Sequence, residues 1–281
     1  MEDLQFKIDE DSCVKCGLCA KDCPNRVINS PKDEFPKLAE GRSGNCLECQ
    51  HCLAVCPTGS LSIFGVDPKE LITVSKSDWP SPESVRAFVR DRRSIRHFKN
   101  ENVSKPLLDT ILSDLQFAPT ARNRRFLDFI VIDDIAAMDA FRESMIRLSE
   151  KALSGGLESP FVKGVVKYYR RDSVDVLFRG APHIIVVSAQ ESQVGGLVDV
   201  ALTLAYFEFL AATSGIGTCW CGFLPIMAAS VPGVRELLGI GPKNHFYALY
   251  FGLPAIKYMR IVKREGTATI RRLSAQELSV Q

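Results

Sequence analysis

The sequence predicts an α+β protein with two unequal parts: a small cysteine-rich head and a larger body in which short strands alternate with helices. The chain has 281 residues and is 46% apolar, enough for a sizeable core. Eight of its ten cysteines fall in two runs within the first 56 residues. After residue 66, apolar residues recur at helical spacing in some segments and form short β-branched runs in others.

Charge and hydropathy narrow the classes of function. Residues 1–66 hold 7 Lys and Arg against 10 Asp and Glu (7 − 10 = −3), and the remainder holds 28 against 23 (28 − 23 = +5). No long basic run is present, so we expect no nucleic-acid partner. The acidic start lacks the pattern of a secretory signal, and we expect a cytoplasmic protein. Asp199 and Glu208 interrupt the longest apolar segment, so we expect no membrane span.

The two cysteine runs read CVKCGLCAKDCP and CLECQHCLAVCP, and each ends in Cys-Pro. The cytosol keeps thiols reduced, which favours metal ligation or catalysis over disulfides. The spacing C-x2-C-x2-C-x3-C-P is typical of two [4Fe-4S] clusters, with the fourth cysteine of each run ligating the other cluster. The predicted ligand sets are Cys13, Cys16, Cys19 and Cys56 for one cluster, and Cys46, Cys49, Cys52 and Cys23 for the other.

Zinc is the alternative metal, but structural zinc needs only four ligands and is usually held by two separated C-x2-C pairs. His51 lies between two predicted ligands of a set that is already complete. The segment resembles the two-cluster ferredoxin family over residues 1–66. This resemblance implies a bacterial-ferredoxin-like bis-[4Fe-4S] domain, a small pseudo-symmetric fold with two short hairpins and two short helices.

The body is predicted to begin after a polar linker at residues 67–84 and to extend over residues 85–281. Ser81, Pro82 and Glu83 form a helix start signal, and Ser104 with Pro106 forms a second. We expect helices over residues 81–91, 104–118, 135–153, 161–178, 198–214 and 231–238, and buried strands over residues 129–132, 183–188 and 247–251.

Two polar segments of the body are candidate binding sites. The segment RDRRSIRHF places Arg92, Arg93, Ser94 and Arg96 close together. Arginine forks match phosphate geometry, so this cluster indicates a phosphate site, with a solvated basic surface as the alternative. The segment APTARNRR supplies Thr120, Arg122 and Asn123, and an exposed turn is its alternative interpretation.

Together these segments resemble the flavin-dependent nitroreductase family. RRSIRHF and APTARN are followed, in the family's order, by APHIIVV, DVALTLAYFEFLAATSGIGTCW, WCGF and FGLPAIKYMR, and the resemblance covers residues 85–270. It implies a nitroreductase-like α+β domain with a central, mainly antiparallel sheet flanked by helices. It also implies FMN bound noncovalently at the interface of a domain-swapped homodimer.

The resemblance assigns roles position by position. Arg92, Arg93, Ser94 and Arg96 would hold the flavin phosphate and pyrimidine edge, with a further phosphate contact from Arg260. Thr120, Arg122 and Asn123 would lie by the isoalloxazine, where Thr120 could reach the partner subunit's flavin. The backbone of Cys221 and Gly222 would face flavin N5.

Some residues depart from the family pattern. Asn123 is followed by Arg124-Arg125-Phe126-Leu127 where the family commonly has x-Gln-Pro-Trp, and Cys221 replaces an acidic residue. Cys219 and Cys221 are a candidate redox pair, with buried apolar packing as the alternative. The helical run of Tyr168, Tyr169, Arg170 and Arg171 is either part of a lid over the substrate or ordinary packing.

The sequence thus predicts an FMN- and iron–sulfur-dependent oxidoreductase in which the clusters pass electrons to FMN, which reduces a nitroaromatic, quinone or similar small acceptor. The alternatives are reductive dehalogenation, enone reduction, a redox sensor, and an electron-transfer module for a protein partner. Ferredoxin, flavodoxin or NAD(P)H are the candidate donors. No catalytic side chain is predicted, because water or substrate can supply the protons.

Overall fold

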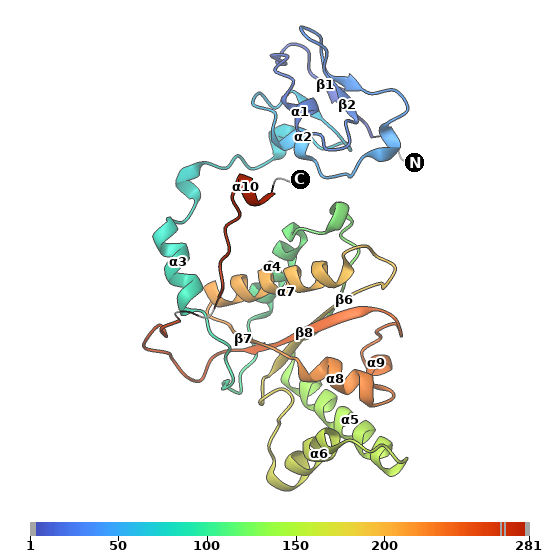
Figure 1. Cartoon of the computed structure of the whole chain (residues 1–281), viewed down its shortest axis with the longest axis vertical. Coiled ribbons are helices and arrows are strands. Elements are labelled where there is room, and N and C mark those ends of the chain that lie inside the picture. The colour runs from blue at the N-terminus through green and yellow to red at the C-terminus, as the bar shows by residue number, and fades with distance from the viewer. Residues whose placement is uncertain (1–3, 265, 267, 279–281) are drawn as a thin grey trace.

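The computed structural model describes residues 4–264, 266 and 268–278. Figure 1 shows the head at one end of the molecule, joined to the body by an extended connection that leads into α3 (Pro82–Asp91). The helices and the four-stranded sheet of the body lie beyond that connection.

The head is built from two short antiparallel strand pairs and two one-turn helices. β1 (Lys7–Ile8) pairs with β4 (Leu61–Ser62), and β2 (Ile28–Asn29) pairs with β3 (Lys37–Leu38). Only the β2–β3 pair is a hairpin. β1 and β4 lie at opposite ends of the segment, which corrects the expectation of two hairpins. The short helices are α1 (Leu18–Lys21), η1 (Ser43–Asn45) and α2 (His51–Ala54).

The head has its own small core. Its buried residues include Val27, Leu53, Leu61 and Ile63, and partly buried cysteines from both runs pack against them. A segment this short buries little apolar surface, so the predicted cluster ligands form part of its core.

The connection between head and body, residues 67–81, is exposed except at the half-buried Pro68. It contains the short turns η2 (Pro68–Glu70) and η3 (Lys76–Asp78) and then α3. α3 begins where the sequence predicts, because the Ser81 hydroxyl accepts a hydrogen bond from the Ser84 N–H and Pro82 occupies the first turn.

The body contains an antiparallel sheet in the order β5-β6-β8-β7. These strands are β5 (Asp128–Ile132), β6 (His183–Ala189), β8 (His245–Gly252) and β7 (Gly217–Trp220). Every residue of β6 is buried, as its continuous apolar sequence predicts. β5 and β7 form the two edges, three strand spacings or about 14 Å apart.

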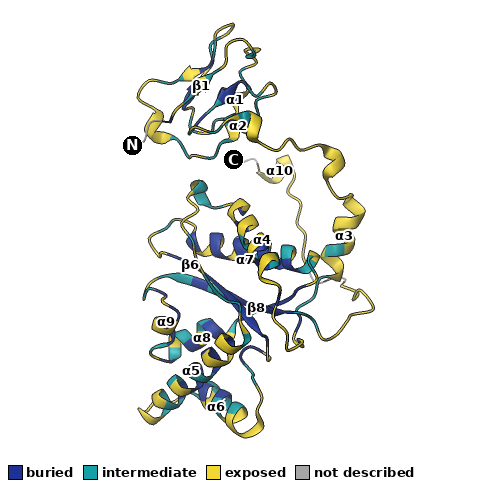
Figure 2. Ribbon diagram, turned by 180° about the vertical axis from the view of Figure 1, so that it is seen from behind, coloured by how far each residue is buried: buried dark blue, intermediate teal, exposed yellow. Residues whose placement is uncertain are grey.

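Helices cover both faces of the sheet (Figures 1 and 2). α4 (Lys105–Asp114) and α7 (Gly196–Thr213) share one core with it. The other core holds α5 (Ile135–Ser154), α6 (Pro160–Asp172), α8 (Phe223–Ser230) and α9 (Val234–Leu237). The turns η4 (Leu115–Phe117) and η5 (Ala121–Asn123) precede β5, and α10 (Ala275–Leu278) lies near the C-terminus.

Two predicted helices of the body differ from those observed, and two observed elements were not predicted. The unpredicted elements are β7 and α8, and the GTCW segment of β7 is too short to show a period. α6 ends at Asp172 instead of residue 178, since Ser173 adopts a left-handed conformation with φ 54° that stops the helix. The helix predicted over residues 231–238 is the shorter α9.

α7 is, among the described residues, the one helix with the length and apolar composition of a membrane span. Its buried face packs against β6 and β8 in the core, and its two acidic residues, Asp199 and Glu208, are buried in that packing. α7 is therefore the central helix of this layer, which explains why it is apolar on most sides.

Candidate cofactor sites

The fold brings the two cysteine runs together in the crossed arrangement that the spacing predicts. Cys19 interacts electrostatically with Cys16 of its own run and with Cys56 of the second run. Burial, together with nearby Cys49, Cys46 and Cys23, raises the pKa of Cys52 to about 11. Each three-cysteine group thus lies beside the fourth cysteine of the other run.

The backbone around these cysteines is bent in the same way in both runs. Lys15 and Gly17 flank Cys16 with φ of 55° and 68°, and Glu48 and Gln50 flank the next run's equivalent cysteine with φ of 52° and 57°. Non-glycine residues rarely adopt this left-handed conformation, and such residues concentrate at functional sites. The two cysteine loops therefore share the same backbone conformation around their central cysteines.

Hydrogen bonds are directed at the sulfurs. The Val27 N–H donates to Cys23 Sγ at 3.2 Å, and the Glu48 N–H donates to Cys46 Sγ at 3.4 Å. Burial opposes ionisation of Cys56, but hydrogen bonds with Ser60 and Thr58 outweigh it and lower the pKa of this thiol to about 7. Bonds of this kind stabilise the thiolate, the form that ligates iron.

The arrangement fits clusters better than single ions. A cavity with apolar walls is lined by Cys23, Cys46, Cys49 and Cys52. Among residues 4–264, 266 and 268–278, no three Cys, His, Asp or Glu side chains are placed to hold one metal ion. Cysteines that bind different corners of a cubane lie farther apart than those around one zinc ion, so the donor set fits [4Fe-4S].

The predicted phosphate residues lie at the β7 edge of the sheet. Arg92 and Arg93 line a cleft of about 530 Å³ together with Thr218, Lys257 and Tyr258. Arg92 Nη1 lies 2.7 Å from Glu208 Oε1, and the Arg93 guanidinium lies 5.2 Å from the centroid of the Tyr258 ring. The cleft therefore gathers three cations against two carboxylates, Asp91 in its lining and Glu208 paired with Arg92, and the remaining positive charge suits an anionic ligand such as a phosphate.

Other residues predicted for this site lie around the cleft. Ser94 forms a parallel bridge with Thr218, and the neighbouring Ile95 N–H donates to the Thr218 carbonyl at 2.8 Å. Arg96 follows on this segment with an exposed side chain. Arg260 is exposed after β8 and does not line the cleft, where Lys257 contributes the cation from that segment.

Cys221 and Gly222 continue the same edge strand into α8. The Cys221 N–H donates to the Ala248 carbonyl at 2.9 Å and is already occupied. Gly222 forms the N-cap of α8, and a Cβ there would lie 3.2 Å from the Tyr247 hydroxyl. Of the predicted pair, Gly222 is therefore the residue with backbone access to a ligand.

The two cysteines of this segment are buried, with Cys219 5% and Cys221 1% exposed. Burial raises the pKa of Cys221 to about 12, so its thiol stays protonated at neutral pH. This favours the packing interpretation over the redox pair.

The second predicted group lies at the β5 edge. Arg122 and Asn123 have φ of 56° and 55°, and the Thr120 hydroxyl accepts a hydrogen bond from the Arg125 N–H at 3.0 Å. The Ala121 N–H donates to the buried Asp199 carboxylate at 2.9 Å, which fixes this turn to the start of α7. It is an ordered turn, not a loose exposed loop.

In one chain, these two groups are far apart. The Thr120–Asn123 turn is bonded to Asp199, and Arg92 of the cleft is bonded to Glu208. Both carboxylates lie on α7, and the nine positions between them correspond to about 14 Å along the helix axis. They also lie at opposite edges of the four-stranded sheet. Within a single chain, the two halves of the predicted flavin site are therefore held about 14 Å apart.

A hydrogen bond joins the head to the β5 edge. Asn123 Nδ2 donates to the Leu47 carbonyl at 3.0 Å, and Leu47 follows the ligand candidate Cys46 directly. The cluster site formed by the second cysteine run and Cys23 thus faces the body at this point.

Sequence reasoning missed Glu208, Asp199 and Lys257. Asp199 and Glu208 are charged residues within an otherwise apolar helical segment. Carboxylates at such positions are buried only when a polar or charged group pairs with them, and this is the signal that could have identified them. Lys257 lies within the FGLPAIKYMR motif, three positions before Arg260, the residue to which the resemblance assigns a phosphate contact.

The lid candidates on α6 have structural contacts. Arg170 forms ion pairs with Glu143 and Glu150 of α5 at 2.9 and 2.8 Å. Hydrogen bonds from Arg170 and Arg147 lower the pKa of Glu143 to about 2. Tyr168 is 47% exposed and Tyr169 packs against the core, which supports packing for most of this run.

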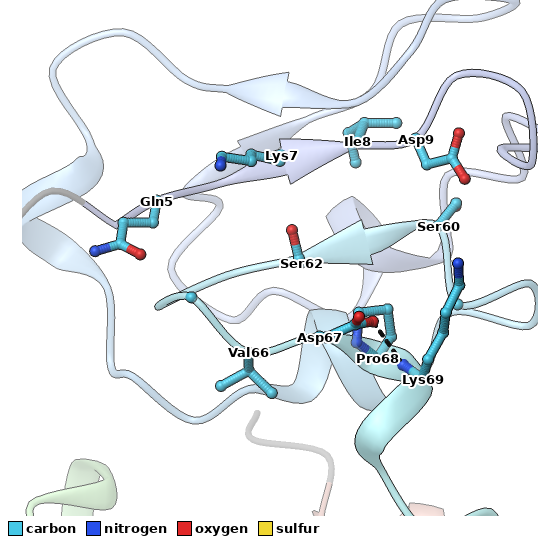
Figure 3. A pocket seen from close by; sticks show the side chains of 12 residues that line it. Gln5, Lys7, Ile8, Asp9, Ser60, Ser62, Val66, Asp67, Pro68 and Lys69 are labelled. Carbon is cyan, nitrogen blue, oxygen red and sulfur yellow. Dashed lines mark hydrogen bonds between the residues drawn. The ribbon is translucent and has the colours of Figure 1, made fainter.

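A third cleft, on the outer side of β1 and β4, contains none of the predicted site residues (Figure 3). Its polar lining includes Lys7, Asp9, Ser62 and Lys69, and Asp67 accepts a hydrogen bond from the Lys69 N–H. It lies on the head, apart from the two halves of the predicted flavin site.

Comparison with known proteins agrees with this division. Residues 8–60 match the model of a 4Fe-4S dicluster domain, and residues 89–253 match that of the nitroreductase family. The head is 33% identical over 67 residues to an uncharacterized ferredoxin of Methanocaldococcus jannaschii, covering 24% of this chain and 87% of that protein. It is 40% identical over 63 residues, 22% of this chain, to the putative electron transport protein YccM of Escherichia coli, of which the match spans only 16%.

Solved structures share the fold of the body. A nitroreductase with bound FMN from Desulfitobacterium hafniense has a TM-score of 0.53 and 24% identity, covering 69% of this chain and 100% of that one. A second with bound FMN, from Bacteroides fragilis, has a TM-score of 0.54 and 18% identity, covering 68% and 97%. Fold and sequence define an oxidoreductase. The chain belongs to the nitroreductase family and carries a 4Fe-4S dicluster domain before its nitroreductase domain, which confirms the predicted fold class and enzyme class.

Proposed function

We propose that this protein is a cytoplasmic FMN-dependent oxidoreductase that receives electrons through its two clusters and reduces a small electron-poor acceptor such as a nitroaromatic or a quinone. The observation that carries the proposal is the hydrogen bond between Asn123 and Leu47, which joins a cluster loop to a predicted flavin segment. Bound FMN converts single electrons into two-electron chemistry. The eight cysteines named above hold the clusters.

The residues of the body have separate tasks in this proposal. Arg92, Arg93 and Lys257 bind the phosphate in the cleft at the β7 edge, and Ser94 and Arg96 lie along the same flavin edge. Glu208 holds the Arg92 fork in position. The Gly222 N–H, at the start of α8, is directed at the flavin ring, and protons come from solvent or substrate.

A homodimer completes the flavin site. Within a chain, the turn that carries Thr120, Arg122 and Asn123 and the arginine cleft are anchored about 14 Å apart along α7. In this proposal, as the resemblance implies, the turn contacts the flavin whose phosphate the partner chain holds. α7 supports the pairing, because it exposes an apolar stripe at Val198, Leu202, Tyr206 and Phe209.

The test is anaerobic purification followed by analysis of metal, sulfide and flavin. We expect about eight irons, eight sulfides and one FMN per chain. Zinc without sulfide would overturn the cluster assignment. Iron and sulfide without FMN would favour an electron-transfer module, as would failure of the purified protein to reduce small acceptors without a protein partner.

The variant Arg93→Ala tests the phosphate site. Loss of charge-assisted hydrogen bonds should raise the Kd for FMN by roughly 10- to 100-fold, measured by titration of the flavin-free protein. The control is Arg147→Ala, an exposed arginine of α5 that is paired with Glu143 far from the cleft. Equal FMN affinity in the two variants would contradict the assignment.

A further inference from the structure

We infer that electrons cross the subunit boundary: the head of one chain reduces the flavin whose phosphate is held by the other chain. This inference rests on the proposed function, in which each flavin lies between the arginine cleft of one chain and the Thr120–Asn123 turn of its partner. It specifies which head serves which flavin, and which cluster is the last donor.

The first step is the position of the head. Its contact with the body is at Asn123, at the β5 edge, through the hydrogen bond to Leu47. The chain enters the body at the opposite edge, because α3 leads directly into Arg92 and Arg93. The exposed connection of residues 67–81 can span up to about 50 Å and carries the head from one edge to the other.

The second step is the separation within one chain. Asp199 fixes the turn that contacts the head, and Glu208 fixes the arginine that lines the cleft. About 14 Å of helix lies between them, and the sheet separates the same two groups by a similar width. In the proposed dimer, the flavin beside a chain's own head is the one that its partner's arginines hold.

The third step is the identity of the last donor. Leu47 lies between Cys46 and Cys49, so the cluster held by the second run and Cys23 is the one next to the body. Charge supports the docking, since the head has a net charge of −3 and the turn that it contacts carries Arg122 and is followed by Arg124 and Arg125.

Each transfer oxidises a reduced cluster by one electron, and two transfers with two solvent protons reduce FMN to FMNH2. A reduced one-electron carrier protein restores the clusters.

Mixed dimers with two different tags test the route. In the first dimer, one chain carries Cys49→Ser and the other carries Arg93→Glu with Arg96→Glu. In the second, both lesions are on one chain and the partner is unaltered. Each dimer should hold about one FMN, measured after acid release, because in each only one arginine cleft is intact.

The two routes give opposite results when a reduced bacterial ferredoxin is mixed with each dimer and the flavin band is followed by stopped-flow absorbance. If electrons cross between subunits, the first dimer bleaches and the second stays oxidised, since only in the first does an intact head face the bound flavin. Bleaching of the second dimer alone would overturn the inference, as would equal bleaching of both. The Cys49→Ser homodimer sets the background of direct flavin reduction.

Failure of the proposed function can be distinguished from failure of the electron route. A wild-type protein without FMN or without a dimer would reject the proposed function before the route is tested. FMN content of the Cys49→Ser homodimer reports whether the body of that variant folds. If it does not accumulate, Cys46→Ser replaces it in the same two dimers.

Discussion

Glu208 shows how much one buried side chain organises in this protein. It is 6% exposed and lies on the central helix α7. Its carboxylate accepts hydrogen bonds from Arg92 at 2.7 Å, from Trp220 Nε1 at 3.2 Å and from the Thr218 hydroxyl at 3.4 Å. A single carboxylate thus connects α7, β7 and the arginine cleft, and it offsets part of the positive charge beside the predicted phosphate.

The substitution Glu208→Gln removes the charge and keeps the size. We expect a loss of about 1–3 kcal/mol in the free energy of unfolding, because Arg92 is left without its buried counter-ion. Urea denaturation of the flavin-free protein measures it. Glu143→Gln is the control, since Glu143 belongs to a surface ion-pair network that solvent screens, and its loss should be smaller. A larger effect at Glu143 would contradict this account.

Cys221 is expected to be chemically inert in the folded protein. With a pKa raised by burial to about 12, its thiolate fraction at pH 8 is on the order of one in ten thousand. Mass spectrometry after brief treatment with iodoacetamide should find Cys221 unmodified in the native protein and modified in urea. Rapid native modification would restore the redox-pair hypothesis for Cys219 and Cys221.

For single residues, the sequence predicts a functional role where the residues share a local motif, and it does not predict contacts between residues that only the tertiary structure brings together. The cysteine runs define their own chemistry through spacing, and the head places Cys23 and Cys56 across from the other run as expected. Glu208 and Arg92 are 116 positions apart, so no local pattern could have paired them.

The helix α7 has two apolar faces. One face packs against β6 and β8 through Val200, Leu204 and Phe207. The other exposes Val198, Leu202, Tyr206 and Phe209, which follow one another at helical spacing. A helix that is apolar on both sides has a second contact surface, and in the proposed dimer this surface meets the partner chain.

Leu202→Glu should therefore separate the dimer. A charge buried at a subunit contact is destabilising, and FMN should be lost with the partner's contribution to the site. Light scattering coupled to size exclusion gives the mass, and absorbance gives the flavin content. Leu237→Glu on α9 is the matched control, because Leu237 is similarly exposed at 41% but lies on another helix. A dimeric, FMN-loaded Leu202→Glu protein would contradict the proposed interface.

Element prediction succeeded where a long periodic or β-branched pattern exists, as in α5 and β6, and failed at β7 and α8. β7 is an edge strand of four residues whose pairing with β8 depends on the rest of the sheet. Strand order was also beyond the sequence, and it is the order that separates the two halves of the flavin site.

The whole molecule has a small core in the head and two larger cores in the body. The head core consists of few residues and has cysteines packed around it, so its stability depends on the bound clusters. The body cores contain no predicted cluster ligand. Loss of iron should therefore affect the two parts unequally.

We expect two calorimetric transitions for the intact protein. Removing iron with a chelator under reducing conditions should abolish the transition of the head and leave that of the body, with its FMN, nearly unchanged. Intact protein with one cooperative transition that chelation shifts as a whole would show that the head and body unfold together. Flavin fluorescence during the same experiment identifies the body transition.

Because the connection of residues 67–81 joins the head covalently to the body, the contact at Asn123 needs to supply little binding free energy. A hydrogen bond contributes only about 1 kcal/mol net, whereas micromolar binding between separate proteins needs about 8 kcal/mol. A covalent tether replaces that affinity with an effective concentration in roughly the millimolar range. In the proposed function, the head therefore leaves its docking turn to meet an external electron carrier and returns, and within an intact dimer its return to the flavin needs no second binding event between separate proteins.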